Sequence, residues 1–325
     1  MGERRGGADH GSGDHQPVGA ARLLEAAAAL RAGRLVILPT ETVYGLAADA
    51  ANPAAVATVY AAKGRPQFNP LIAHVADLEA ASRIAHLVPQ ARTLAEAFWP
   101  GPLTLVAPIR DPAAVCDLAR AGLDTVAVRA PAHPVARGLL DAFGGPVVAP
   151  SANRSGRPSP TTFADAMAET GEAAALGLDG GACAVGLEST VVSLLDGPPR
   201  LLRPGAITRR QIEALIGPLA EAEADARRSP GRMARHYAPN APVRLEAGSP
   251  RPGEVRLGFG PGPDGPDVIW LSRTGDLAEA AANLFSALRA ADARAPAAIA
   301  VPPIPGEGLG EAINDRLRRA AGYVG

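Results

Sequence analysis

The stretch from Lys63 to His74 concentrates side chains that could bind an anion. It contains an ammonium group in Lys63, a guanidinium group in Arg65, and the imidazole of His74 near the end of the apolar run 71–75. A helix with Asn52 as its N-cap is expected just before it, so the helix dipole alone could also explain the two cations. His74 taken alone is more typical of a buried core histidine. The crowding of these groups nonetheless favours a multiply charged ligand such as a nucleoside triphosphate.

Further polar clusters stand at the ends of predicted buried strands. Arg129 ends the predicted strand 124–129, where its guanidinium fork could bind a carboxylate. The other clusters lie beside apolar runs, in the segments 39–46, 150–159, 186–190 and 203–205. Serine, threonine and asparagine also favour turns for local reasons, so each cluster by itself can be an ordinary turn. Their repetition at strand ends is typical of an α/β enzyme with one composite site.

The elements that must position these clusters alternate between helix and strand. Apolar spacing predicts this alternation across residues 20–216, and the strand 35–38 is apolar on both faces, as in the centre of a parallel or mixed sheet. A charged, weakly patterned segment follows, and a smaller α/β unit is expected from residue 242. We predict four strands and two helices in that unit, at 243–245, 255–258, 268–271 and 298–301, and at 276–290 and 313–321.

Composition excludes several classes of function. The 325 residues carry a formal net charge of −1, so no overall attraction to nucleic acid is indicated. Cys116 and Cys183 are far apart and form no CxxC or Cys/His motif, so neither a disulfide framework nor a structural zinc site is expected. Residues 1–17 are rich in Gly, Asp and His, which predicts a disordered tail rather than a signal peptide. The cysteine pattern favours a reduced, cytoplasmic setting. Because no apolar run is long enough to span a bilayer, we expect no membrane partner.

The sequence contains no HExxH, Walker A or GxSxG motif. A site that is rich in Lys, Arg, Thr, Ser and Asn but has no evident nucleophile is typical of phosphoryl or nucleotidyl transfer. The residues alone therefore predict a soluble α/β enzyme that binds anions and holds no metal through its own side chains.

Six motifs in a fixed order resemble one known family. They are Pro39-Thr40-Glu41-Thr42-Val43-Tyr44-Gly45-Leu46, Lys63-x-Arg65-Pro66 with Asn69-Pro70-Leu71 and His74, Val128-Arg129-x-Pro131, Pro150-Ser151-Ala152-Asn153, Glu188-Ser189-Thr190-Val191 and Arg203-Pro204-Gly205. Together they are similar to the motifs of the threonylcarbamoyl-AMP synthases, which have the YrdC-like fold. The later motif His236-Tyr237-Ala238-Pro239 and the C-terminal unit resemble the long, two-domain form of that family.

The resemblance implies a catalytic domain built on a twisted, open, mixed sheet with helices, followed by a smaller Rossmann-like α/β domain. On this basis we predict a disordered tail at 1–17, a YrdC-like catalytic domain at 18–217, a linker at 218–241 and a C-terminal domain at 242–325. The linker carries arginine, histidine and tyrosine side chains that a spacer does not need. We therefore expect it to cover the active site.

The resemblance also implies the reaction. ATP, L-threonine and bicarbonate would be converted to threonylcarbamoyl-AMP and pyrophosphate, with Mg²⁺ accompanying the ATP. The product would pass to the tRNA threonylcarbamoyl transferase for threonylcarbamoyl-adenosine formation, and tRNA itself is a candidate partner. Two other functions stay open at this point: an RNA-binding module, and carbamoyl transfer in metalloenzyme maturation, although that relative carries zinc fingers whose CxxC motifs are absent here.

Site residues can be carried over position by position. The resemblance implies threonine contacts at Thr42, His74, Arg129, Ala149 and Ser189. It implies ATP contacts at Arg65, Asn69, Thr125, Ser151, Ser159, Arg203 and Tyr237. Lys63 and Arg65 are expected to act as catalytic residues that neutralise the triphosphate as pyrophosphate leaves.

Overall fold

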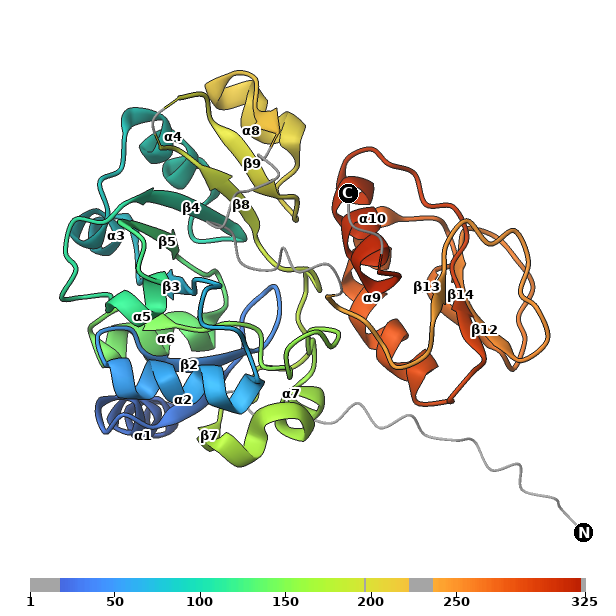
Figure 1. Cartoon of the computed structure of the whole chain (residues 1–325), viewed down its shortest axis with the longest axis horizontal. Coiled ribbons are helices and arrows are strands. Elements are labelled where there is room, and N and C mark those ends of the chain that lie inside the picture. The colour runs from blue at the N-terminus through green and yellow to red at the C-terminus, as the bar shows by residue number, and fades with distance from the viewer. Residues whose placement is uncertain (1–17, 196, 222–235, 323–325) are drawn as a thin grey trace, which may run out of the picture.

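The computed structural model describes residues 18–195, 197–221 and 236–322 and arranges them in two units (Figure 1). The predicted tail and most of the predicted linker lie outside the described residues. The first unit is built on a ten-stranded mixed sheet with the strand order β10-β9-β8-β4-β5-β3-β6-β2-β1-β7. Its strands are β1 (Leu35–Leu38), β2 (Gly45–Asp49), β3 (Ile72–His74), β4 (Leu103–Pro108), β5 (Thr125–Arg129), β6 (Val147–Val148), β7 (Ala174–Gly177), β8 (Thr190–Ser193), β9 (Arg200–Arg203) and β10 (Ala220–Glu221).

Helices cover both faces of this sheet. They are α1 (Ala20–Arg31), α2 (Pro53–Lys63), α3 (Leu78–Ile84), α4 (Pro89–Phe98), α5 (Asp117–Arg120), α6 (Pro134–Phe143), α7 (Phe163–Thr170) and α8 (Arg209–Ile216). In β1, Val36 and Leu38 enter the apolar cluster that contains residues of α1 and α6, while Leu35 and Ile37 enter the one that contains residues of α2, α3 and α4. This alternation is why the strand is apolar on both faces. No helix in the described part of the chain is long and apolar enough to cross a membrane.

Local sequence signals set both ends of α2, the helix that delivers Lys63. Asn52 caps its start, because the side-chain oxygen accepts hydrogen bonds from two amides of the first turn, and Pro53 follows at the first helical position. Gly64 ends the helix with a positive φ of 57°, a conformation that glycine adopts without strain. The predicted position of Lys63 at a helix C-terminus is thus confirmed.

Two strands of this sheet are not expected from the sequence. The alanine-rich segment 45–49 was assigned no strand, yet it forms β2, which pairs antiparallel with β1 and is almost entirely buried. Strand β10 pairs parallel with β9 and lies inside the range 218–241 that the sequence analysis treats as linker. The first sheet therefore continues to Glu221.

The second unit is a smaller α/β structure, as the sequence predicts. Its four-stranded sheet has the order β11-β14-β12-β13, every pairing in it is parallel, and α9 and α10 pack against it. The bounds are β11 (Val243–Arg244), β12 (Glu254–Phe259), β13 (Val268–Ser272), α9 (Leu277–Asp292), β14 (Ala298–Ala300) and α10 (Leu309–Ala320). The apolar core of this unit also takes in Val43 and Leu187 from the first unit and Tyr237 from the linker end.

The two units lie close together at Gly186, beside α9. A Cβ atom at this position would lie 2.5 Å from the Cα and the carbonyl oxygen of Ala282, a distance that no real Cβ shows. The residue also has a positive φ of 70°. Only glycine satisfies both conditions, so the segment that leads to Glu188 and Ser189 can lie directly against the second unit.

Candidate active site

A cavity lies where the carboxyl ends of β3, β5 and β9 meet the start of β8, and the linker end closes one side of it. Strands β3 and β5 are parallel neighbours, and their register pairs His74 with Arg129. Strands β8 and β9 are antiparallel, so Arg203 at the end of β9 lies beside the start of β8. Strand ends of this kind are the usual ligand site of an open α/β sheet.

Most of the residues named from the sequence lie together in this cavity. Those that line it are Thr42, Arg65, His74, Arg129, Ala149, Ser151, Ser189, Arg203 and Tyr237. They come from segments that span almost two hundred positions of the chain, and the fold brings them to one place. The strand-end clusters therefore form a single composite site.

Four of the named residues do not line the cavity. Lys63 and Ser159 lie behind it and bind residues that do, as described below, and Asn69 uses its backbone carbonyl to accept hydrogen bonds from Tyr60 and Arg65. Thr125 stands at the other end of β5 from Arg129, about 13 Å away along the strand. Because side chains alternate, it is on the same face of the sheet as Arg129.

Arg129 is buried and held by three groups. Its Nε donates to the carbonyl of Gly101 at 3.2 Å, one terminal nitrogen donates to Thr42 Oγ1 at 2.9 Å, and the other donates to Glu41 Oε1 at 2.5 Å. A guanidinium has five N–H donors, so two remain for a ligand. Burial raises the pKa of Glu41, but the charge of Arg129 and its hydrogen bond outweigh that effect and leave the pKa below its usual value. Both partners of this buried pair are therefore charged.

Arg203 and Ser189 are joined to each other in the cavity lining. The Nε of Arg203 donates to the backbone carbonyl of Ser189 at 3.0 Å, and its terminal nitrogen donates to the Ser189 hydroxyl at 3.2 Å. That hydroxyl is also 2.7 Å from the hydroxyl of Thr104. Burial lowers the pKa of Arg203, although a guanidinium stays protonated at any physiological pH.

Arg65 contributes a third cation. Its Nε lies 3.4 Å from the carbonyl of Asn69, and its terminal nitrogen donates to the carbonyl of Pro70 at 3.2 Å. Burial lowers its pKa to about 10, and Arg203 acts in the same direction. Arg65, Arg129 and Arg203 thus line one cavity within a protein whose net charge is −1. Such a concentration of buried positive charge suits a polyanion.

Lys63 supports the loop that carries Ser151. Its ammonium group donates to the backbone carbonyls of Ser151 and Asn153, and the side chain is buried. Burial lowers its pKa well below the usual value, and the neighbouring Arg65 adds to this shift. In this arrangement Lys63 holds the loop in place, and its expected contact with a triphosphate stays a prediction.

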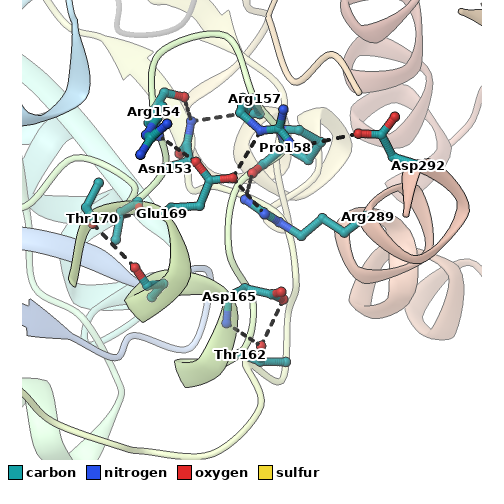
Figure 2. Close-up of polar contacts among 12 residues, drawn as sticks. Asn153, Arg154, Arg157, Pro158, Thr162, Asp165, Glu169, Thr170, Arg289 and Asp292 are labelled. Carbon is teal, nitrogen blue, oxygen red and sulfur yellow. Dashed lines mark hydrogen bonds and ion pairs between the residues drawn. The ribbon is translucent and has the colours of Figure 1, made fainter. Parts of the chain in front are cut away.

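The loop 151–159 is also held from the second unit. Glu169, from α7, accepts hydrogen bonds from Arg157 of this loop at 3.1 Å and from Arg289 of α9 at 2.9 Å. Figure 2 shows these three side chains together. Arg289 also donates to a backbone carbonyl of the loop, and Arg157 lies 3.6 Å from Asp292 of α9. Charges from both units therefore alternate around the loop that carries Ser151.

Sequence reasoning assigned no role to two charged or titratable lining residues. Glu188 was noted only as part of the Glu188-Ser189-Thr190-Val191 motif, and His236 only as part of the linker motif. Burial lowers the pKa of His236 well below its usual value, and Arg65 and Lys63 add to that shift. Their places in the sequence indicate them, because Glu188 directly precedes Ser189 and His236 directly precedes Tyr237, and both of these are assigned to a ligand.

His74 is neutral in the folded protein. Burial lowers its pKa from 6.5 to about 3, and Arg129 adds to the shift. Its Nδ1 is buried without a hydrogen-bond partner among the described residues. A neutral imidazole beside Arg129 can therefore bind a polar group of a ligand without adding charge.

This pKa predicts an acid-dependent loss of stability. As the pH falls below 6.5, the unfolded chain binds a proton at His74 and the folded chain does not, so the free energy of unfolding decreases by up to about 1.4 kcal/mol per pH unit. In His74→Asn this dependence should be weaker between pH 6.5 and 4.5, as measured by urea unfolding. A replacement of the exposed His86 is the control. An unchanged slope in His74→Asn would contradict the assignment.

Comparisons with known proteins agree with this two-domain fold. Two family models match the chain: one described as "Telomere recombination" over residues 28–205, and one described as "Threonylcarbamoyl-AMP synthase, C-terminal domain" over residues 207–322. A threonylcarbamoyl-AMP synthase of Bacillus subtilis (strain 168) is 42% identical over 324 residues, which cover 93% of each chain. One of Pyrococcus abyssi (strain GE5 / Orsay) is 42% identical over 325 residues, which cover 92% of this chain and 93% of the relative.

A solved structure extends the agreement to both units. The crystal structure of P. abyssi Sua5 complexed with L-threonine superposes with a TM-score of 0.87 at 39% identity, over 95% of this chain and 96% of that one. The resemblance stated from the motifs and the two-domain α/β fold are both confirmed by these matches. The chain therefore belongs to the threonylcarbamoyl-AMP synthase family.

Proposed function

We propose that this chain is a nucleotidyltransferase that makes threonylcarbamoyl-AMP and pyrophosphate from ATP, L-threonine and bicarbonate. The observation that carries the proposal is that three arginines, Arg65, Arg129 and Arg203, line one cavity. Hydrogen bonds to Thr42 and Glu41 fix Arg129 there. One carboxylate and one polyphosphate are the charges that this arrangement can neutralise. The relatives named above carry the same activity in their names.

L-Threonine fits the Arg129 side of the cavity. The two N–H groups that Arg129 does not use can bind the amino-acid carboxylate as a fork, as in other Arg–carboxylate pairs. His74 and Ser189 are within the same lining and can bind the threonine hydroxyl or amine. The P. abyssi structure bound to L-threonine supports threonine as the substrate.

ATP fits the side of Arg65, Ser151 and Arg203. The threonine amine attacks the carbon of CO₂, or of bicarbonate with loss of water, and gives up a proton to form an N-carboxylate. An oxygen of this carbamate then attacks the α-phosphorus of ATP, and the bond from that phosphorus to the bridging oxygen of pyrophosphate breaks. Arg65 and Arg203 are placed to neutralise the leaving pyrophosphate. Because both bonds are between substrate atoms, no protein nucleophile is needed.

We propose that Mg²⁺ enters with the ATP rather than as a resident metal. No group of three or more His, Cys, Asp or Glu side chains suited to a metal ion occurs in residues 18–195, 197–221 and 236–322. The one carboxylate among the described lining residues, Glu188, is already bound to Arg316 and Ser159. Phosphate oxygens and water are therefore the expected ligands of the cation.

The linker end supports the predicted cover of the active site. His236 and Tyr237 line the cavity, and the next amide, of Ala238, donates to the carbonyl of Gly156 in the loop 151–159 at 2.7 Å. We propose that the linker shields the adenylate from water until it passes to a tRNA-modifying transferase. A cytoplasmic location and a contact with tRNA belong to the same proposal.

Pyrophosphate release by the purified protein tests the function. We expect release from ATP to need both L-threonine and bicarbonate, and to fall to background when either is omitted. The new product should have the mass of threonylcarbamoyl-AMP. Release that ignores threonine would contradict the proposal and bring forward the RNA-binding and carbamoyl-transfer alternatives.

A further inference from the structure

Arg316 of α10 is the most deeply buried charged residue that joins the two units. Its side chain has no exposed surface, although it belongs to the second unit. Its Nε donates to Glu188 Oε2 at 3.0 Å, and one terminal nitrogen donates to the carbonyl of Pro204 at 2.8 Å and to Asp315 at 2.9 Å. Glu188 and Pro204 are in the first unit, so this one side chain reaches across the boundary between the units to the wall of the cavity.

Glu188 requires Arg316 as a counter-charge because its carboxylate is buried in the wall of the cavity. It lines the cavity together with residues assigned to threonine and residues assigned to ATP, and it is the one carboxylate among the described lining residues. Arg316 binds one of its oxygens, and the hydroxyl of Ser159 donates to the other. Burial raises its pKa, but Arg316, Arg203 and this hydroxyl outweigh that effect, so the pKa is lower than usual and the group is ionised.

An ionised carboxylate in this position repels the negatively charged triphosphate of ATP. A triphosphate that enters the cavity meets a buried negative charge, and charges interact far more strongly away from water than in it. Removing one partner of a buried ion pair leaves the other uncompensated, whereas removing both charges is close to neutral. The counter-charge of Arg316 therefore bears directly on the affinity for ATP.

Arg316 contacts a second lining residue. Its guanidinium carbon lies 5.5 Å from the centre of the Tyr237 ring, a cation–π distance, and the same ring lies 5.3 Å from that of Phe285 in α9. Tyr237 has a positive φ of 61°, an unusual conformation for a tyrosine that needs support from its surroundings. Arg316 thus contacts Glu188 in the wall of the first unit and Tyr237 at the linker end.

We propose that Arg316 is a positioning residue of the active site, which neutralises Glu188 and seats Tyr237 so that the cavity accepts ATP only when α10 is docked. The second unit then contributes a charge to the catalytic domain rather than serving as a separate module. This inference rests on the proposed function, because it takes ATP as the ligand.

A double-mutant cycle on the full chain tests the inference. We expect Arg316→Met to raise the KM for ATP by about tenfold or more and to change the KM for threonine less, because the uncompensated charge of Glu188 acts on the polyanion. Adding Glu188→Gln should recover most of the lost ATP affinity, since both charges are then gone. Arg318→Met, which removes an exposed arginine of the same helix, is the matched control and should leave both KM values within about twofold.

The outcomes separate the inference from the proposed function and from simple unfolding. A wild-type protein that releases no pyrophosphate with ATP, threonine and bicarbonate refutes the proposed function. A working wild type in which the double variant is no better than Arg316→Met refutes the inference, because a merely structural role predicts losses that add. Thermal unfolding shows whether Arg316→Met folds. If it does not, the KM values for ATP of the double variant and of Arg316→Lys test the inference instead. The inference would also be refuted if Arg316→Lys had the same KM for ATP as the wild type while the double variant Arg316→Met/Glu188→Gln had a KM for ATP at least tenfold higher.

Discussion

Replacing Arg129 with lysine is expected to raise the KM for L-threonine by about a hundredfold, while the KM for ATP changes by less than about threefold. Lysine keeps the positive charge that Glu41 needs but presents an ammonium group instead of a planar fork. Two charge-assisted hydrogen bonds to the amino-acid carboxylate are thereby replaced by a single weaker contact. Pyrophosphate release measured against each substrate in turn separates the two effects.

The choice of lysine and of a control follows from the buried environment. Alanine at this position would leave the carboxylate of Glu41 buried and unpaired, so activity and folding would be lost together. Arg120→Lys is a suitable control, because Arg120 is also buried and pairs with a carboxylate, that of Asp117, but is not among the residues that line the cavity. An Arg129→Lys variant with unchanged threonine KM would refute the carboxylate site.

Cutting the chain after Gly217 is expected to lower turnover by about a hundredfold or more. The cut removes His236 and Tyr237 from the cavity lining, and it leaves Glu188 without Arg316. It also exposes apolar side chains of the first unit that are buried in the core of the second. Pyrophosphate release and thermal unfolding of the same samples give activity and folding side by side.

A second truncation distinguishes the linker from the second unit. A chain that ends at Ala241 keeps the linker but not α9 and α10. We expect it to be as inactive as the shorter one, because Glu188 then lacks its ion-pair partner Arg316, and Tyr237 lacks Arg316 and Phe285. Recovery of activity in this longer fragment would assign the cover to the linker alone. Full activity in the fragment that ends at Gly217 would show that neither part is needed and would refute the predicted cover.

Features set by local sequence could be predicted from the sequence. The N-cap Asn52 and the C-terminal Gly64 define α2 and place Lys63. The apolar run before Arg129 defines a strand that has Arg129 at its carboxyl end. These signals act within a few residues of one another. The motif resemblance then predicts that such strand ends form one site, and most of the residues named from it line one cavity.

Features set by tertiary packing could not be predicted in this way. Arg316 shares the buried face of α10 with Ile313, Leu317 and Ala320, so its spacing indicates burial, yet only the fold shows that its partner is Glu188. Lys63 was expected to face a triphosphate, but the carbonyl oxygens that surround its ammonium group belong to a loop about ninety residues away in sequence. Such contacts leave no periodic pattern, because their partners are far apart in the chain.

The separation of Glu188 from Arg316 also has a consequence during synthesis. The two residues are 128 positions apart, and the ribosome makes the chain from its N-terminus. The whole catalytic sheet, up to Glu221, is therefore made well before α10 leaves the ribosome. With the inferred role of Arg316, a nascent chain that still lacks α10 binds ATP weakly, so its nucleotide turnover stays low until α10 has been translated.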